Sequence, residues 1–262
     1  MSSYKLFIFL RQKFSLFLKK IKKVLFFGFL YNKNDRSYMK KLIIQIILRL
    51  ALIVIGVVGI ILTASSTSFM GDKVTFTFFT VQSNITIILI ELVYLIDAIL
   101  QLFGKKSFSN NILLIIKYLF TVAITITFLV FVFMLAPTLD NSYLFSFNNY
   151  SLHFIVPIIA LVDFFIFNSD IKLTKLNCLW GTAMPIYYVI YFLIGIPQGR
   201  TYLYGDHAPY FFLNYEKLTW FSFTENGPGV FYWILILTAG IVALCYLFYF
   251  LMWLRQKLNK KV

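Results

Sequence analysis

Six long apolar runs decide what this chain can fold into. Each is close to the roughly 20 residues that an α-helix needs to cross the hydrocarbon core of a bilayer. The runs cover about residues 42–62, 79–103, 112–135, 151–167, 177–195 and 230–254. Inside lipid, every backbone N–H and C=O group must be paired within the protein, so such runs predict helices. The expected fold class is all-α, a polytopic membrane protein with six transmembrane helices, and the short fourth run should extend beyond these limits.

Composition agrees with a membrane protein and argues against several other classes. The 262 residues are 60% hydrophobic and only 13% charged, whereas soluble domains carry about a quarter charged residues. We expect no nucleic-acid partner despite the net charge of +14, because the basic residues lie beside apolar segments and no soluble domain is left to hold a duplex. Cys178 and Cys245 lie within apolar runs and are interpreted as small core residues. With two histidines and no Cys/His cluster, the sequence predicts no metal site and no cofactor.

Lys and Arg are concentrated in alternate connections between the runs. Residues 1–41 hold eleven of them. The other basic connections are 104–111, 168–176 and 255–262, whereas those with few or none are 63–78, 136–150 and 196–229. By the positive-inside rule, this alternation predicts a multi-pass protein of the cell membrane with both termini in the cytoplasm. The expected parts are a basic amphipathic cytoplasmic or interfacial segment (1–41), a six-helix transmembrane domain (42–254) and a basic cytoplasmic tail (255–262).

The N-terminal segment has an apolar face beside a lysine-rich one. Apolar residues recur at steps of three and four from Phe7 to Val24, and basic residues interrupt them too often for a cleavable signal peptide. We expect an amphipathic helix over residues 1–30 that lies in the membrane interface and is held by anionic lipid headgroups. A basic cytoplasmic tail without fixed structure is the alternative.

The second run opens with a polar cluster in the stretch FTFFTVQSN, residues 76–84. On a helix, Thr80, Asn84 and Glu91 fall on one stripe, and Thr77 extends that stripe by one turn. Glu91 lies near the middle of the run, where an ionisable side chain is costly and usually has a partner or a task. The second helix is therefore expected to turn one polar face into the protein.

Two other polar stretches are expected at the same depth as Thr80. In the topology above, the second and fourth helices run in the same direction, so His153 also lies near the outer membrane face. Pro157 cannot donate a hydrogen bond to the carbonyl of His153, which predicts a kink with a polar spot beside the imidazole. The 196–229 connection, which contains Tyr210, lies on the same side. Together these stretches predict a polar pocket at the extracytoplasmic face.

Three further charges within the runs are interpreted as structural. Asp97 and Lys117 each lie about six residues from the inner end of a helix, so their depths match across a short hairpin. We expect them to form an ion pair, with a proton relay as the alternative, because charges within a membrane tend to pair. Asp163 is expected to meet Lys172 or Lys175.

Four motifs resemble those of a known family. FTFFTVQSN, SLHFIVPIIALVDFF, MPIYYVIYFLIGIPQG and APYFFLN follow the order and spacing seen in bacterial Pr6Pr-type membrane proteins. That family is similar, more distantly, to the androgen-induced/Far-17a group. The resemblance covers residues 42–254. It departs at Ala208, where relatives often have tyrosine, and at Phe164 and Phe165, where they often have tryptophan.

The resemblance implies a chemistry. In the Far-17a group, a membrane-embedded threonine and a histidine are thought to hydrolyse lipid esters, including fatty acid esters of hydroxy fatty acids. His153 matches the histidine and Thr80 the threonine, with Thr77 as the alternative one turn away. A neutral imidazole can take the proton from a hydroxyl that attacks an acyl carbon. The side-chain amides of Gln82 and Asn84 are candidate donors to the oxyanion, although they serve equally well as helix-packing or capping residues.

Three functional classes therefore remain open. An intramembrane lipid-ester hydrolase needs Thr80 and His153, with membrane lipids as partners and an acyl lipid as substrate. A carrier or sensor of a small or lipidic ligand would use the same pocket, with Glu91 as a binding or coupling charge; Tyr210 is a further candidate binding residue. A structural membrane protein needs none of these groups, because polar residues in membrane helices often bond only to neighbouring helices and tyrosines often form interfacial belts.

Overall fold

Six helices in the described part of the chain are long and apolar enough to cross a membrane. The structure, a computed structural model, describes residues 33–65, 74–139, 144–168, 171–202 and 206–259. The spans are Ser37–Ser65, Phe79–Leu102, Asn111–Leu135, Phe147–Phe167, Asn177–Gln198 and Val230–Leu258. The all-α class and the six spans are thus confirmed, and the fourth span begins earlier than its apolar run, as expected. The interfacial helix predicted over residues 1–30 lies outside the described residues.

Three of the six spans change helix type along their length. The elements that form the spans are α2 (Lys33–Ser65), α3 (Phe79–Leu102), α4 (Asn111–Val130) with the π-helix η3 (Phe131–Leu135), α6 (Phe147–Tyr150) with the π-helix η5 (Ser151–Ile155) and α7 (Val156–Phe167), the 3₁₀-helix η6 (Asn177–Thr182) with α8 (Ala183–Gly195), and α10 (Val230–Asn259). The fifth span ends with η7 (Ile196–Gln198). The connections contain η2 (Thr75–Thr77), η4 (Ala136–Thr138), η9 (Phe211–Leu213), α9 (Tyr215–Leu218), and the strands β1 (Phe223–Thr224) and β2 (Gly227–Pro228). The two strands pair antiparallel, with Phe223 opposite Pro228.

The described residues divide into two compact units, one within 33–47 and 95–108 and one within 48–94 and 109–259. In the described part of the smaller unit, the Asp97 carboxylate accepts hydrogen bonds from Gln101 Nε2 (2.7 Å), Ser107 Oγ (2.9 Å) and the Phe108 amide (2.8 Å). These three donors satisfy the Asp97 carboxylate at the turn after α3.

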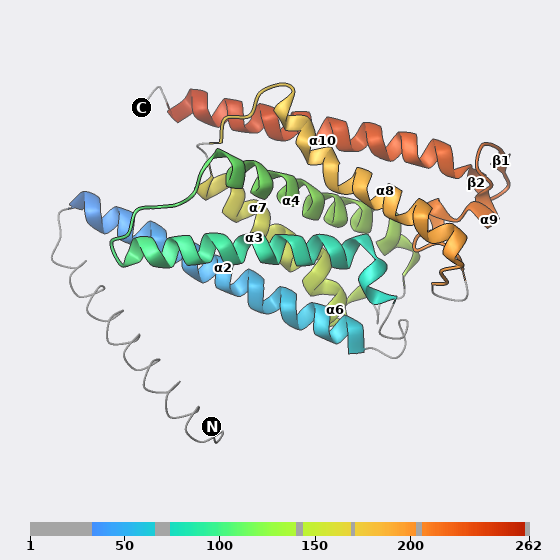
Figure 1. Ribbon diagram of the computed structural model, residues 1–262, viewed down its shortest axis with the longest axis horizontal. Helices are drawn as coiled ribbons and strands as arrows, with labels where there is room; N and C mark the ends of the chain where they lie inside the picture. The colour runs from blue at the N-terminus through green and yellow to red at the C-terminus, as the bar shows by residue number, and fades with distance from the viewer. Residues whose placement is uncertain (1–32, 66–73, 140–143, 169–170, 203–205, 260–262) are drawn as a thin grey trace, which may run out of the picture. The chain divides into compact units, whose positions relative to one another are not determined.

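In the larger unit, α4 packs against α7, η6 and α8, and α10 packs against η6 (Figure 1). The core at this junction contains the rings of Tyr118, Phe164 and Phe248, and the Tyr118 hydroxyl donates to the Cys178 carbonyl (2.7 Å). Cys178 and Cys245 are buried free thiols, as the sequence predicted.

Glycines let α2 approach its neighbours closely within this unit. A Cβ atom at Gly56 would lie 2.7 Å from Ile88 Cδ1 on α3, and one at Gly59 would lie 2.9 Å from Leu152 Cδ2 and closer still to Ser151 Oγ on η5. Both separations are too short for real atoms. A larger residue at Gly59 would therefore force the Ser151 and Leu152 side chains to move, within the π-helix that carries His153.

Four charged side chains meet in the interior of the larger unit. Lys117 Nζ lies 2.9 Å from Glu91 Oε1 and also contacts Asp163. Arg49 Nε lies 3.0 Å from Asp163 Oδ1 and 3.5 Å from Glu91 Oε2. The Tyr94 ring lies 4.4 Å from Lys117 Nζ, close enough for a cation–π contact. The four side chains are almost completely buried and their formal charges sum to zero.

This cluster corrects two expectations. The partners of Lys117 are Glu91 and Asp163, not Asp97. Asp163 pairs with Lys117 and Arg49 rather than with Lys172 or Lys175. Charges buried away from water need partners of opposite sign within reach, and here four different helices, α2, α3, α4 and α7, supply one charge each.

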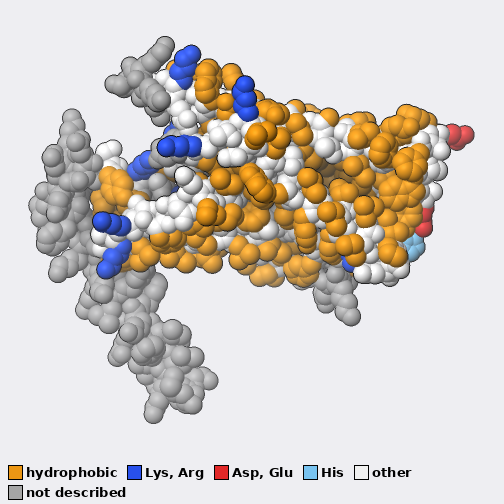
Figure 2. Space-filling view, turned by 45° about the horizontal axis from the view of Figure 1, so that its top comes forward, with side chains coloured by type: hydrophobic (Ala, Val, Ile, Leu, Met, Phe, Trp, Pro, Cys, Tyr) orange, Lys and Arg blue, Asp and Glu red, His pale blue; other side chains and the backbone are white. Residues whose placement is uncertain are grey.

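Much of the exposed surface of the larger unit is apolar. Figure 2 shows a face covered largely by hydrophobic side chains. The exposed large side chains include Val54, Ile61, Leu89, Ile112, Phe133, Ile186, Ile190 and Ile236. This surface suits lipid contact, because lipid tails solvate apolar side chains that water would not.

Candidate functional site

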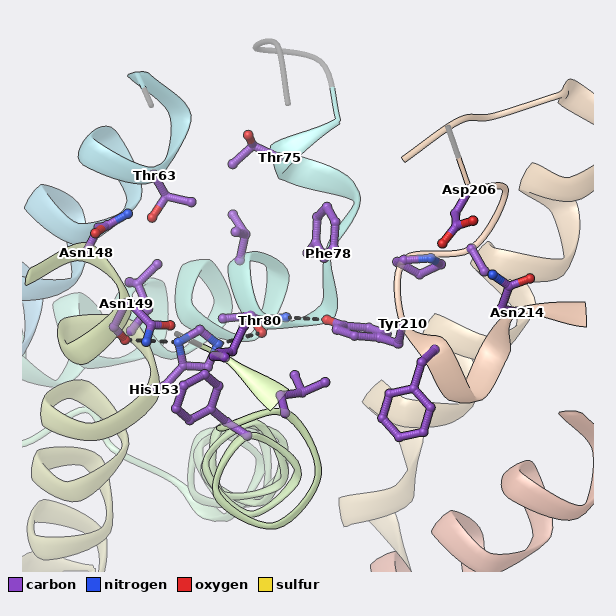
Figure 3. Close-up of a pocket in the computed structure, with 18 of the residues that line it drawn as sticks. Thr63, Thr75, Phe78, Thr80, Asn148, Asn149, His153, Asp206, Tyr210 and Asn214 are labelled. Atoms are coloured by element: carbon purple, nitrogen blue, oxygen red, sulfur yellow. Dashed lines mark hydrogen bonds between the residues drawn. The ribbon is translucent and has the colours of Figure 1, made fainter. Parts of the chain in front are cut away.

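A cavity of about 540 Å³ in the larger unit is lined by three of the residues that the sequence singled out. Its walls come from the first turn of α3, from the π-helices η3 and η5, and from the connection between α8 and α10. The volume lies within the range of roughly 300–1,000 Å³ that is typical of small-molecule sites. Thr80, His153 and Tyr210 line this cavity, and Figure 3 shows Thr80 between the imidazole and the phenol.

Thr80 and His153 are within hydrogen-bonding distance of each other. Thr80 Oγ1 lies 3.3 Å from His153 Nε2, and His153 Nδ1 lies 2.9 Å from the Asn149 carbonyl oxygen. A carbonyl can only accept, so Nδ1 must carry a proton. In the neutral imidazole, Nε2 is then the acceptor, and the Thr80 hydroxyl donates to it. This is the arrangement of a hydroxyl nucleophile with its general base, at a separation typical of a site without substrate.

The backbone around His153 departs from α-helical geometry. Pro157 has no N–H group, and the preceding turn, η5, is a π-helix in which the Val156 amide donates to the Ser151 carbonyl. The sequence predicted a kink here, and the structure has a π-helix. A second π-helix, η3, begins at Phe131, whose ring stacks on the His153 imidazole with centroids 4.0 Å apart. Such π-turns occur often at functional sites, because they redirect side chains out of the regular helical register.

Thr80 lies in the first turn of α3, where backbone N–H groups have no partner within the helix. The Thr80 amide donates to the Tyr210 hydroxyl oxygen across 3.4 Å. Aligned peptide dipoles make this end of a helix favourable for negative charge. The nucleophile candidate is therefore placed where a developing oxyanion would be stabilised.

Tyr210 forms the wall of the cavity beside Thr80. Its ring stacks on Phe212 with centroids 5.2 Å apart and meets Phe78 edge-on. Burial raises the pKa of the Tyr210 phenol, and hydrogen bonds with Thr80 only partly offset this effect. The phenol therefore keeps its proton at neutral pH and remains available as a hydrogen-bond donor.

The other predicted site residues lie outside the cavity wall. Asn84 Nδ2 donates to the carbonyls of Thr80 (2.8 Å) and Leu152 (3.1 Å), so both its N–H groups are engaged in packing. Gln82 Nε2 donates to the Phe76 carbonyl (3.2 Å). The packing interpretation of these amides fits the structure better than the oxyanion interpretation. Glu91 contacts Lys117 and Arg49 in the buried charge cluster, and so does not line the cavity.

Thr77, the alternative nucleophile, has its hydroxyl engaged with a backbone carbonyl. Its hydroxyl donates to the Val74 carbonyl (2.6 Å), and its own carbonyl accepts from the Tyr188 hydroxyl (3.1 Å). Of the two threonines, Thr80 is therefore the one that the structure brings to His153.

Three features of the site were missed at the level of sequence. The Asn149 carbonyl acts through a backbone atom, and Phe131 is one phenylalanine among 31, so neither has a distinctive signal. Asp206 and Lys217, which line the cavity and pair at 2.9 Å, were visible only as charges in a long connection.

Comparison of the chain with protein-family models, with curated proteins and with solved structures found no match.

Proposed function

We propose that this membrane protein hydrolyses lipid esters, with Thr80 as nucleophile and His153 as general base. The observation that carries the proposal is the Thr80–His153 contact of 3.3 Å, with the imidazole held in the correct tautomer by the Asn149 carbonyl. The resemblance of the sequence motifs to the Pr6Pr-type and Far-17a proteins supports the same assignment. A membrane enzyme with a site between its helices meets acyl lipids as its most abundant substrates.

The reaction proceeds in two displacements. Thr80 Oγ1 attacks the ester carbonyl carbon while His153 Nε2 takes the hydroxyl proton, and a tetrahedral oxyanion forms. The bond to the alcohol oxygen then breaks, and the leaving alcohol receives the proton from His153. Water next attacks the acyl-threonine, with its proton passing to His153. When the acid leaves, this proton returns to Thr80.

The oxyanion needs donors other than the amides of Gln82 and Asn84. The Tyr210 phenol is placed to supply one, because it lies against the Thr80 amide and is protonated at neutral pH. The positive end of the α3 dipole, at the first turn of the helix, adds to this stabilisation. A low-dielectric site strengthens each of these interactions.

The direct test uses a serine/threonine-directed fluorophosphonate on the full-length protein in lipid nanodiscs, alongside a panel of lipid esters. We expect ester turnover and an adduct on the peptide that contains Thr80. The expectation follows from the contact between the Thr80 hydroxyl and the lone pair of His153 Nε2. Stoichiometric binding of an ester with neither turnover nor adduct would instead make the protein a lipid carrier or sensor. An adduct on a different hydroxyl would refute the assignment of Thr80.

We also propose that the protein resides in the cell membrane with both termini in the cytoplasm, which places the cavity at the extracytoplasmic face. The basic connections 104–111 and 168–176 support this orientation. Anionic headgroups would then be the partners of the basic residues in 1–41.

Cysteine labelling in intact cells checks the orientation. With Cys178 and Cys245 buried, an impermeant maleimide should modify a cysteine introduced at Asp206 and spare one introduced at Lys106. Permeabilised cells should give labelling at both positions. Modification at Lys106 in intact cells would invert the topology.

A further inference from the structure

A second cavity of about 220 Å³ lies in the larger unit between α4, α8 and α10. Its aliphatic walls include Ile126 and Val130 on α4, Val189 on α8, and Leu237 on α10. The volume is below the range of roughly 300–1,000 Å³ usual for drug-sized ligands, yet above the 150 Å³ of an engineered apolar cavity that binds benzene. Such a space suits one narrow apolar group.

Three of the hydroxyl groups around this cavity already bond within the protein. The Thr127 hydroxyl pairs with Ser83 Oγ (2.7 Å), the Thr182 hydroxyl donates to the Leu179 carbonyl (2.8 Å), and the Tyr188 hydroxyl donates to the Thr77 carbonyl (3.1 Å). A buried water needs two to four polar partners, and these three groups are already occupied. The cavity therefore favours an aliphatic occupant over water or a polar ligand.

The two cavities meet at the reacting groups. Thr80, Leu135 and Tyr210 line both of them. An aliphatic chain that fills the second cavity thus ends beside the Thr80 hydroxyl, and whatever it is attached to continues into the first cavity. An ester carbonyl between chain and headgroup would lie at this junction.

One wall of the second cavity reaches the lipid-facing surface. Ile186 and Ile190 line the cavity and are 54% and 52% exposed. The exposed residue Thr238 lines it from α10. The close packing of α10 is against η6, at the start of the fifth span, and not along the length of α8 (Figure 1). The exposed wall of the cavity therefore lies between α8 and α10.

We propose that the cavity between α4, α8 and α10 binds a single unbranched acyl chain of the substrate, and that this chain enters sideways from the bilayer between α8 and α10. The identity of the chain as part of an ester rests on the proposed hydrolase function. The chain-binding site itself rests on the second cavity, its apolar walls and its exposed wall.

The test measures binding without turnover, so that this proposal and the hydrolase proposal can fail separately. The probe is a palmitoyl ester with a diazirine in its chain, photolysed in nanodiscs that contain the full-length Thr80→Val protein. We expect cross-links on peptides of α8 and α10, including those that carry Val189 and Leu237. Cross-links confined to the outer surfaces of α2 or α7 would overturn the chain site.

Two variants narrow the cavity from opposite walls, so that one misfolded protein does not end the test. Val189→Trp and Leu237→Trp should each lower cross-linking roughly tenfold, because about two methylene groups of the chain would no longer be buried. Both variants should also shift the preference to shorter chains. Val54→Trp, at an exposed position on α2 outside both cavities, is the matched control and should leave cross-linking unchanged. Equal cross-linking in all three variants would overturn the site. Cross-linking that follows this pattern, together with the absence of ester turnover in the protein that retains Thr80, would keep the chain site and refute the hydrolase.

Discussion

Replacing Thr80 with valine should lower ester turnover to the uncatalysed background, a loss on the order of 10⁴-fold or more. Valine preserves the shape of threonine and removes only the hydroxyl that faces His153 Nε2. His153→Gln should cost roughly 10²–10⁴-fold, the usual contribution of a general base. Both losses should be in kcat, measured with the same lipid ester in nanodiscs, with the folded yield of each variant checked by size-exclusion chromatography.

Two further variants make this expectation specific. Thr77→Val removes a hydroxyl that bonds to the Val74 carbonyl, and Thr86→Val removes one that bonds to the Ser83 carbonyl. Neither hydroxyl faces the imidazole, so both variants should retain turnover. The double variant Thr80→Val with His153→Gln should be no slower than Thr80→Val alone, because the two groups act as a unit. A larger loss in Thr77→Val than in Thr80→Val would move the nucleophile one turn back along the chain.

Lys117→Met should destabilise the protein by about 3–5 kcal/mol, the usual cost of breaking a buried ion pair from one side. The change leaves the carboxylates of Glu91 and Asp163 facing each other with Arg49 as their one remaining cation in the cluster. Stability is measured by unfolding the protein in mild detergent and monitoring the loss of folded monomer. Lys105→Met, in the exposed turn after α3, is the matched control and should change the stability little.

The partner variant shows whether the loss comes from charge or from packing. Adding Glu91→Gln to Lys117→Met removes the second charge and leaves the Arg49–Asp163 pair intact at 3.0 Å. We expect the double variant to recover more than half of the lost stability, as a double-mutant cycle with strong coupling. Purely additive losses would show that the two side chains do not depend on each other.

The fold was predictable because the thickness of the bilayer sets the length of each transmembrane helix. Six apolar runs give six spans, and the predicted and observed starts agree at Phe79, Asn177 and Val230. The charge pairing was only partly predictable. Depth along a helix follows from residue number, but the direction of a side chain around the helix axis matters equally. Glu91 and Asp97 are six residues apart on α3, so they point roughly 120° apart, and only packing decides which of them meets Lys117.

The candidate site was likewise predictable only in part. Thr80, His153 and Tyr210 could be proposed from sequence, because polar side chains at equal depth in apolar helices stand out. The Asn149 carbonyl that fixes the imidazole could not, since every residue has a carbonyl. The acyl-chain cavity could not be predicted either. It is an empty space between aliphatic side chains, and the sequence does not show whether such side chains fill a space or surround it.

The four-charge cluster is completed only late in the synthesis of the chain. Ribosomes release α2, α3 and α4 before α7, so Arg49, Glu91 and Lys117 enter the membrane before Asp163 is made. Each such charge costs about 2.5–3.5 kcal/mol to insert alone at the centre of a helix. The charges on α2 and α3 can neutralise each other, but Lys117 leaves the nascent bundle with an excess positive charge until α7 arrives. The fourth span thus supplies the carboxylate that balances the charge of the cluster.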